Sequence, residues 1–213
     1  MDKDNITEIF EVLKKDNPSP MTELKYKTKF QLLISVILSA QTTDKSVNAA
    51  TAKLFKIAGT PKKIYALGEE KLKGFIRSIG LYNAKAKNVV QTCKILMTKF
   101  QNKVPSDRET LQKLPGVGRK TANVVLNNAF GLPTIGVDTH VFRVSNRLGI
   151  AQGKNVLGVE KKLEKNVPEK FKLHAHHWLI ILGRYTCIAR RPLCGKCKVF
   201  EFCRYKKKII NDD

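Results

Sequence analysis

Apolar residues recur along this chain with the spacing of an α-helix. In residues 6–15, for example, Ile9, Phe10 and Leu13 fall on one face, and prolines follow where the pattern stops. No segment alternates convincingly between apolar and polar residues, as a half-buried strand does. The pattern predicts an all-α protein with helices over residues 6–15, 30–41, 44–58, 61–67, 69–79, 83–100, 107–114, 119–130, 139–148, 156–166 and 172–188.

Local signals mark several helix starts and one boundary between larger parts. Thr60-Pro61 is typical of an N-cap followed by the first helical residue, and residues 106–109, Ser-Asp-Arg-Glu, have the pattern of a capping box. Residues 131–133, Gly-Leu-Pro, interrupt the helical pattern. We therefore expect two helical lobes, one formed by residues 22–132 and the other by residues 1–21 together with residues 133–213.

Positive charge dominates the composition. The 213 residues include 40 Lys and Arg against 18 Asp and Glu, which gives a formal net charge of +22 at pH 7. A chain with this excess is attracted to polyanions, and nucleic acid is the first candidate. Most of the positive residues are Lys, and Ile and Asn are also abundant, so a general drift of composition is a second explanation. The charge favours a nucleic-acid partner without selecting one.

We expect no signal peptide in this sequence. It lacks the basic start and long apolar stretch of a signal peptide. Its strongest apolar run, residues 30–40, is shorter than the about 20 residues that span a bilayer. We therefore expect a soluble intracellular protein with reduced thiols and no membrane partner. Four of the five cysteines lie in the last 27 residues, which points to a metal site.

The most informative segment is a glycine-containing turn between two predicted helices, residues 114–122, Leu-Pro-Gly-Val-Gly-Arg-Lys-Thr-Ala. Two glycines two residues apart permit a tight turn with positive φ and close approach of the backbone. The helix that follows presents free N–H groups and the positive end of its dipole, so a backbone phosphate would fit there. A lone Gly-x-Gly would be consistent with an ordinary turn. The whole string favours DNA binding through Gly116, Gly118, Arg119 and Thr121.

Residues 114–125 resemble the helix-hairpin-helix motif of the DNA glycosylase superfamily. Residues 137–144, Val-Asp-Thr-His-Val-Phe-Arg-Val, resemble its catalytic aspartate segment, and residues 39–44 and 79–82 are similar to two further family segments. With the cysteine tail, the resemblance covers essentially the whole chain and is strongest to the endonuclease III family. It implies base excision repair by a bifunctional DNA N-glycosylase, which removes oxidised pyrimidines and then cleaves the abasic strand.

The resemblance implies that Lys120 and Asp138 are catalytic. A carboxylate can stabilise the positive charge that builds on the sugar as the base leaves. An unprotonated amine can attack C1′ and form a Schiff base. Nearby cations, a helix N-terminus and partial desolvation would all lower the pKa of a lysine and so favour its unprotonated form. From chemistry alone, Lys120 could instead be one phosphate contact among 31 lysines, and Asp138 only an N-cap. Because Lys120 matches the family's nucleophile, it favours the bifunctional reaction over simple base removal.

An enzyme of this kind must move the damaged base out of the helical stack. Gln41 and Leu81 match family positions that insert into the duplex, and both lie beside turns from which a side chain can project. Taken alone, Leu81 would be interpreted as a core residue. His140 lies two residues after Asp138 and is a candidate for the base pocket, although a structural role is a second interpretation.

The C-terminal region contains a dense set of candidate ligands, namely Cys187, Cys194, Cys197 and Cys203. Four thiolates suit tetrahedral zinc or an iron–sulfur cluster, and spacing alone does not choose between them. Structural zinc sites usually have two short Cys pairs, whereas only one pair is short here. The resemblance implies a 4Fe-4S cluster held by the loop 187–203. Such a loop would present Arg190 and Arg191, with Lys196 and Lys198, to phosphates.

The resemblance also implies a partner and a location. The partner is double-stranded DNA containing damaged pyrimidines or abasic sites, and the protein is expected to be a monomer in the bacterial cytoplasm, associated with the nucleoid. Two other hypotheses share parts of the pattern: a base-only glycosylase of the same fold, and a DNA-binding protein without catalysis. The presence of both Lys120 and Asp138 argues against the second.

Overall fold

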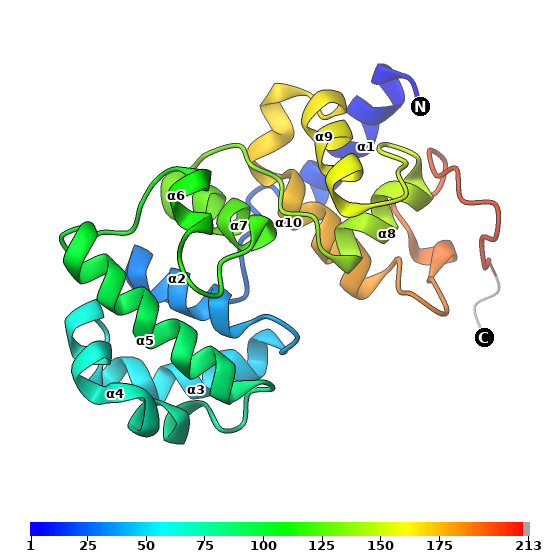
Figure 1. The fold of residues 1–213 in the computed structure, drawn as a ribbon. Helices are drawn as coiled ribbons and strands as arrows, with labels where there is room; N and C mark the ends of the chain where they lie inside the picture. Colours follow the sequence, from blue (N-terminus) through cyan, green and yellow to red (C-terminus); the bar gives the residue numbers. More distant parts are fainter. Residues whose placement is uncertain (211–213) are drawn as a thin grey trace. The chain divides into compact units, whose positions relative to one another are not determined.

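The computed structural model describes residues Met1–Ile210, and these residues form ten α-helices and one 3-10 helix, with no β-strand among them (Figure 1). The all-α prediction is confirmed for this part of the chain. No helix within it combines the length and apolar character needed to cross a membrane. The elements are α1 (Lys3–Asp16), α2 (Lys29–Leu38), α3 (Asp44–Ile57), α4 (Pro61–Ile76), α5 (Tyr82–Lys99), α6 (Arg108–Gln112), α7 (Arg119–Phe130), α8 (Thr139–Leu148), α9 (Val156–Asn166), α10 (Glu169–Tyr185) and η1 (Cys194–Lys196).

Side-chain caps explain many of the predicted helix starts. The Lys63 N–H donates to Thr60 Oγ1 at 3.3 Å, and Pro61 is the first residue of α4. Gly68, with φ 77°, interrupts α4 and separates the two segments that the sequence predicts as two helices. The predicted capping box is wrong by one residue, because the N-cap of α6 is Asp107, whose Oδ1 accepts from the Thr110 N–H at 2.8 Å. A carboxylate caps as well as a hydroxyl and adds negative charge at the helix N-terminus.

Among the helices that end earlier than predicted, α2 and α10 differ most from the prediction. α2 ends at Leu38, and Gln41 has the left-handed φ of 54°, which an α-helix does not accommodate. α10 ends at Tyr185. The Cys187 N–H then donates a hydrogen bond to the Leu182 carbonyl at 2.6 Å. In both cases a candidate functional residue, Gln41 or Cys187, therefore lies in a loop instead of a helix.

The chain divides into two compact units. Residues Thr22–Phe130, which we call the hairpin unit, form one of them. Residues Met1–Met21 and Gly131–Asp213, which we call the cysteine unit, form the other. Each unit has an apolar core of its own, so each supplies its own framework for functional residues.

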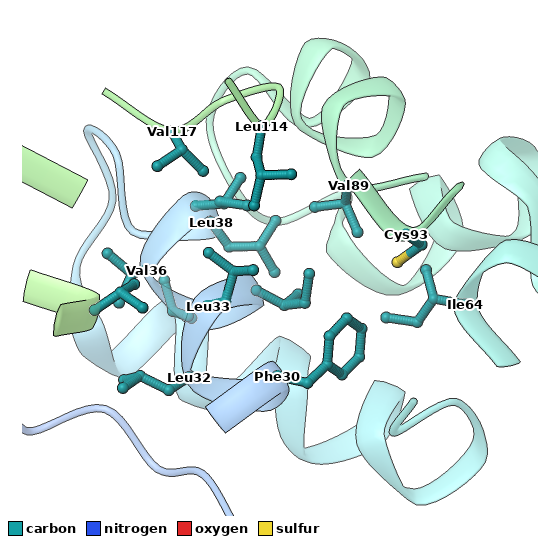
Figure 2. Packing of buried hydrophobic residues seen from close by; sticks show 14 of the residues in the cluster. Phe30, Leu32, Leu33, Val36, Leu38, Ile64, Val89, Cys93, Leu114 and Val117 are labelled. Carbon is teal, nitrogen blue, oxygen red and sulfur yellow. The ribbon is translucent and has the colours of Figure 1, made fainter. Parts of the chain in front are cut away.

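The core of the hairpin unit is built around α2. Every residue from Phe30 to Leu38 is buried, as expected for a helix that is apolar on all sides. α2 contacts α3, α5 and α7, while α4 packs on α3 and α5. Figure 2 shows Leu114 and Val117, from the turn before α7, in the same cluster as the α2 residues. The turn is therefore anchored to this core.

In the cysteine unit, α10 contacts α1 and α8, and α8 contacts α9. The rings of Phe10, Phe171 and Trp178 pack with centroids 5.6–6.1 Å apart. His176 on α10 is 2 % exposed, and its Nδ1 donates to the Gly136 carbonyl at 2.7 Å. This hydrogen bond holds the segment that leads to Asp138 against α10.

Candidate active site

The turn before α7 is held by apolar and polar contacts within the hairpin unit. Leu114 and Val117 are 2 % and 6 % exposed, and the Val117 N–H donates to the Leu114 carbonyl at 3.1 Å. From α5, the Thr92 hydroxyl donates to the Pro115 carbonyl at 3.0 Å. The apolar residues of the turn thus point into the core, while the glycines remain exposed.

The two glycines of this turn are required for different reasons. Gly116 has φ 80°, and a Cβ at this position would lie 3.1 Å from Ile37 Cγ2 and 3.2 Å from Asn88 Nδ2. Glycine is needed here for both its backbone conformation and its small size. A Cβ at Gly118 would meet no atom within 4 Å. The space above Gly118 is therefore open to a ligand that approaches the backbone.

The first residues of α7 follow this opening directly. Arg119, Lys120 and Thr121 are the first three residues of the helix, and all three are half-buried. The Ala122 N–H donates to the Gly118 carbonyl at 2.9 Å. The N–H groups of a first helical turn have no carbonyl within the helix to bind, and the helix dipole is positive there. The arrangement can bind an anion with the Lys120 amine beside it.

Asp138 is the N-cap of α8. Its Oδ1 accepts hydrogen bonds from the backbone N–H groups of His140 and Val141, each at 2.9 Å. Within residues 1–210, Oδ2 accepts no hydrogen bond, and the side chain is half-buried. One oxygen therefore caps the helix and the other is available to a substrate, so capping and catalysis are compatible.

His140 is oriented by α10 and by its own helix. A Cβ at Gly183 of α10 would lie 2.9 Å from the His140 Cβ, so only glycine permits this approach of α10 to α8. His140 Nδ1 lies 3.2 Å from Arg143 Nη2. Because a guanidinium can only donate, Nδ1 is the acceptor, and Nε2 carries the proton of the neutral ring. His140 can thus donate one hydrogen bond to a ligand.

Gln41 and Leu81 share an uncommon conformation. Gln41 has φ 54° and Leu81 has φ 59°, in the left-handed region that bulky residues seldom adopt. Both side chains are exposed, and Leu81 is 61 % exposed. The core interpretation of Leu81 is therefore wrong. Exposed side chains on strained backbone are a feature of functional sites.

The four C-terminal cysteines line one cavity, which is partly open to solvent. Its other walls are mostly apolar and include Leu148, Leu182 and Phe200. A zinc ion would require its sulfur ligands about 2.3 Å from one point. Among residues 1–210, no three His, Cys, Asp or Glu side chains are grouped so that they could hold one metal ion. The four thiols line this one cavity, and four cysteine thiolates are a donor set for zinc or an iron–sulfur cluster.

Two arginines of α8 hold the start of the cysteine loop. Arg143 donates to the Cys187 carbonyl at 3.0 Å and to the Gly183 carbonyl at 2.8 Å. Arg147 donates to the carbonyls of Ile188 at 2.8 Å and Ala189 at 2.7 Å, and lies 3.5 Å from Cys187 Sγ. Sequence reasoning missed both residues. Their spacing of four on one helix was a signal of a shared face, but their partners lie on a segment remote in the chain.

Two of the four thiols, those of Cys197 and Cys203, have environments that disfavour an isolated thiolate. Burial raises the pKa of Cys197 and of Cys203, and their proximity to other cysteines raises it further. Backbone N–H groups of Val199 and Tyr205 oppose this effect at the two sulfurs. Four thiolates in one cavity need positive charge to balance them, and a metal centre supplies it. The donor set is therefore suited to a metal group.

The cationic residues of the cysteine loop differ in their surroundings. Arg190, Arg191 and Lys196 are exposed. Lys198 instead forms an ion pair with Asp16 of α1. We predicted that all four would be presented to phosphates, and this ion pair shows that Lys198 has a partner within the cysteine unit.

Comparison with known proteins agrees with these features. A model of the HhH-GPD superfamily of base excision DNA repair proteins matches residues 34–169. The endonuclease III proteins of Escherichia coli strain K12 and of Haemophilus influenzae are each 57 % identical over 209 residues, which cover 98 % of this chain and 99 % of theirs. A trapped endonuclease III–DNA covalent intermediate is 46 % identical, with a TM-score of 0.90 and 96 % of both chains covered. A thermostable thymine-DNA glycosylase, 23 % identical with a TM-score of 0.84, shares the fold.

The helical fold and the hairpin are those of the HhH-GPD superfamily. Within this superfamily, the chain belongs to the endonuclease III family. It is a DNA glycosylase and AP lyase of base excision repair. The family carries a 4Fe-4S cluster.

Proposed function

We propose that Lys120 is the nucleophile of both reactions. Its neutral amine attacks C1′ of the damaged nucleotide while the bond from C1′ to the base breaks, and the base leaves with the bonding electrons and takes up a proton. The supporting observation is the position of Lys120, which is the second residue of α7 and directly follows the open turn at Gly118. A phosphate bound at that turn would bring a neighbouring sugar within reach of the amine.

Strand cleavage follows from the same bond. The nitrogen of Lys120 loses a proton and the sugar ring opens, which gives a Schiff base between nitrogen and C1′. Removal of a proton from C2′ then expels the 3′ phosphate by β-elimination, and water releases the enzyme. The structure of a relative has been obtained as a trapped covalent intermediate with DNA, which agrees with a covalent route.

Asp138 is proposed as the carboxylate that stabilises the developing positive charge on the sugar. Its Oδ1 is occupied by two backbone N–H groups of α8, which fixes the orientation of the carboxylate. Its Oδ2 can then face the sugar without reorganisation during the reaction. Lys120 belongs to the hairpin unit and Asp138 to the cysteine unit.

We propose three kinds of DNA contact: binding of backbone phosphates, insertion into the duplex and contact with the displaced base. Backbone N–H groups around Gly116 and Gly118, with Arg119 and Thr121, bind phosphate, and Arg190 and Arg191 of the cysteine loop add further phosphate contacts. Gln41 and Leu81 enter the space that the displaced base leaves. The Nε2–H of His140 is available to the displaced base. The exposure of Leu81, Arg190 and Arg191 supports these roles.

Cys187, Cys194, Cys197 and Cys203 are proposed to hold a 4Fe-4S cluster. When bound, the cluster supplies iron–thiolate bonds that tie the loop 187–203 together. The shared cavity and the four-thiol donor set support a metal group here, and the similarity to endonuclease III proteins favours the cluster over a single zinc ion. Arg143 and Arg147 hold the loop to α8, whose first turn is capped by Asp138.

The damaged bases are proposed to be oxidised pyrimidines, in double-stranded DNA, and the enzyme to act as a monomer in the cytoplasm on nucleoid DNA. Support comes from the similarity to endonuclease III proteins over nearly the full length of both chains. Abasic sites are substrates for the second reaction alone.

The test is incubation with duplexes that carry thymine glycol, uracil or an abasic site, with and without borohydride. Borohydride reduces a Schiff base and leaves protein and DNA covalently joined. We expect cleavage and trapping with thymine glycol and with the abasic site, and neither with uracil. Excision without trapping would assign the chain to the base-only glycosylases. Preference for uracil would contradict the proposed substrate class.

A further inference from the structure

Two turns of the hairpin unit that carry the proposed inserting residues lie close to each other. The Gln41 turn lies between α2 and α3, and Leu81 directly precedes α5. A Cβ at Gly80 would lie 3.8 Å from the Gln41 carbonyl, which is ordinary van der Waals contact. Gln41 and Leu81 are therefore presented by one continuous piece of backbone surface, although they are separated by 40 residues in sequence.

One buried lysine is bonded to both turns. Lys85, in the first turn of α5, is only 4 % exposed. Its ammonium donates to the Leu38 carbonyl at 2.9 Å, to the Ala40 carbonyl at 2.6 Å and to Thr42 Oγ1 at 2.9 Å. Its backbone N–H donates to the Leu81 carbonyl at 3.0 Å. An ammonium has three N–H groups, so its hydrogen-bonding capacity is fully used.

The positions of these acceptors indicate what Lys85 does. Leu38 and Ala40 precede Gln41 and Thr42 follows it, so the ammonium bonds to the chain on both sides of the strained residue. The carbonyls at the C-terminal end of α2 carry partial negative charge, which compensates a buried cation. A lysine in this environment does not bind phosphate. Its contacts instead fix the Gln41 turn against the helix that begins after Leu81.

We propose that Lys85 is a positioning residue for base displacement. It acts through Gln41 and Leu81 and does not itself contact DNA. It keeps the two side chains at a fixed separation, so that both enter the duplex in one step. This inference rests on the proposed insertion of Gln41 and Leu81. A purely structural role would affect stability in the same way as any other core contact of the hairpin unit.

The main test compares Lys85→Met with a stability control. Met keeps most of the buried stem and removes all three donors. Leu72→Ala removes a fully buried side chain of α4 in the same unit and leaves the three hydrogen-bond donors of the Lys85 ammonium in place. A 2-aminopurine next to a thymine glycol reports unstacking by its fluorescence, and single-turnover excision reports the rate. Because misplacement by about 1 Å can cost up to about 10²-fold, we expect Lys85→Met to lower both signals by about tenfold or more. Leu72→Ala should change neither at a temperature where it is folded.

A milder pair of variants covers the case in which Lys85→Met does not fold. Thr42→Val removes one acceptor of the ammonium, and Thr51→Val removes a buried hydroxyl of α3 that donates only within its own helix. Thr42→Val should lower the unstacking signal and the excision rate by about threefold, near the energy of one hydrogen bond. Thr51→Val should leave both unchanged. Equal behaviour of the two variants would overturn the proposal.

A double-mutant cycle separates this inference from the proposed function. In a Gln41→Ala/Leu81→Ala background, Lys85→Met should cause no further loss, because it acts through those residues. A full additional loss would show that Lys85 acts by another route. Normal unstacking and excision in Lys85→Met, with a defective Gln41→Ala/Leu81→Ala protein, would overturn this inference alone. Normal unstacking in Gln41→Ala/Leu81→Ala would overturn the insertion role and this inference with it.

Discussion

The hairpin unit and the cysteine unit hold their functional segments by different kinds of contact. In the hairpin unit, Leu114 and Val117 anchor the turn before α7 in an apolar core. In the cysteine unit, the guanidinium groups of Arg143 and Arg147 bind backbone carbonyls, and the four thiols surround a cavity. Apolar packing is complete with the chain alone, whereas thiols around a cavity are completed by a bound group. The hairpin should therefore keep its geometry without metal, and the cysteine loop should not.

The largest effect is expected from a substitution of Lys120 in the hairpin unit, which should remove the reaction but leave DNA binding nearly unchanged. Lys120→Gln should remove base excision and borohydride trapping, because the attacking amine is lost. Binding of a damaged duplex should stay within about threefold, less than 1 kcal/mol, because backbone groups of the turn hold the phosphate. Gel-based cleavage and fluorescence anisotropy measure the two quantities. Undiminished strand cleavage would place the nucleophile elsewhere.

The second prediction concerns metal in the cysteine unit. Anaerobically purified protein should be brown, with about four iron atoms per chain and negligible zinc. Cys197→Ser should lose iron and weaken DNA binding, while Cys93→Ala, in the core of the hairpin unit, should keep its iron. Metal analysis decides between iron and zinc, and stoichiometric zinc would contradict the assignment. Full DNA affinity of an iron-free, folded Cys197→Ser protein would show that the loop is not a binding element.

Acid should destabilise the cysteine unit, because the buried His177 lies in it. Burial lowers the pKa of His177 to about 4. The unfolded chain titrates near 6.5, so it binds more protons than the folded chain between about pH 6.5 and 4. Stability should fall as the pH falls through this window, by up to about 3 kcal/mol, and stay level above it. Urea unfolding followed by the fluorescence of Trp178 measures this, and His177→Gln should flatten the profile. An equally steep profile in that variant would exclude His177 as the cause.

Asp138→Asn tests whether the cap of α8 is also catalytic. The amide oxygen can still accept from the N–H groups of His140 and Val141, so the protein should remain folded. Base excision should fall by at least about tenfold, or 1.4 kcal/mol of barrier, because the negative charge near the sugar is lost. Single-turnover rates on a thymine glycol duplex measure the effect. Near-normal turnover would leave Asp138 with a capping role only.

The smallest effect is expected from the two glycines of the turn. Gly116→Ala should destabilise the hairpin unit by about 1–2 kcal/mol, because alanine is strained at φ 80° and its Cβ would press on Ile37. Gly118→Ala should change stability by less than about 0.5 kcal/mol, since its Cβ would meet open space. Thermal unfolding of the free proteins compares them. Equal losses would show that the turn is not held as tightly as its contacts indicate.

Much of the fold and part of the site were predictable because their causes are local. Helical periodicity, the Thr60-Pro61 start and the helix after the glycine turn each depend on a few consecutive residues, and the structure has each of them. The capping position at Asp107 was missed by one residue, since two neighbouring residues can both cap. The family resemblance implied the proposed roles of Lys120 and Asp138, which local chemistry left open.

The sequence by itself determined the helices, the glycine turn and the set of four thiols. Only the tertiary structure decided that the thiols face one cavity, that Leu81 is exposed and that Lys85 is buried beneath the Gln41 turn. The partners of the Lys85 ammonium lie 43–47 residues away in sequence, and those of Arg147 lie 40–42 residues away. Periodicity and turn preferences act over a few neighbouring residues, whereas such contacts exist only after distant helices have packed.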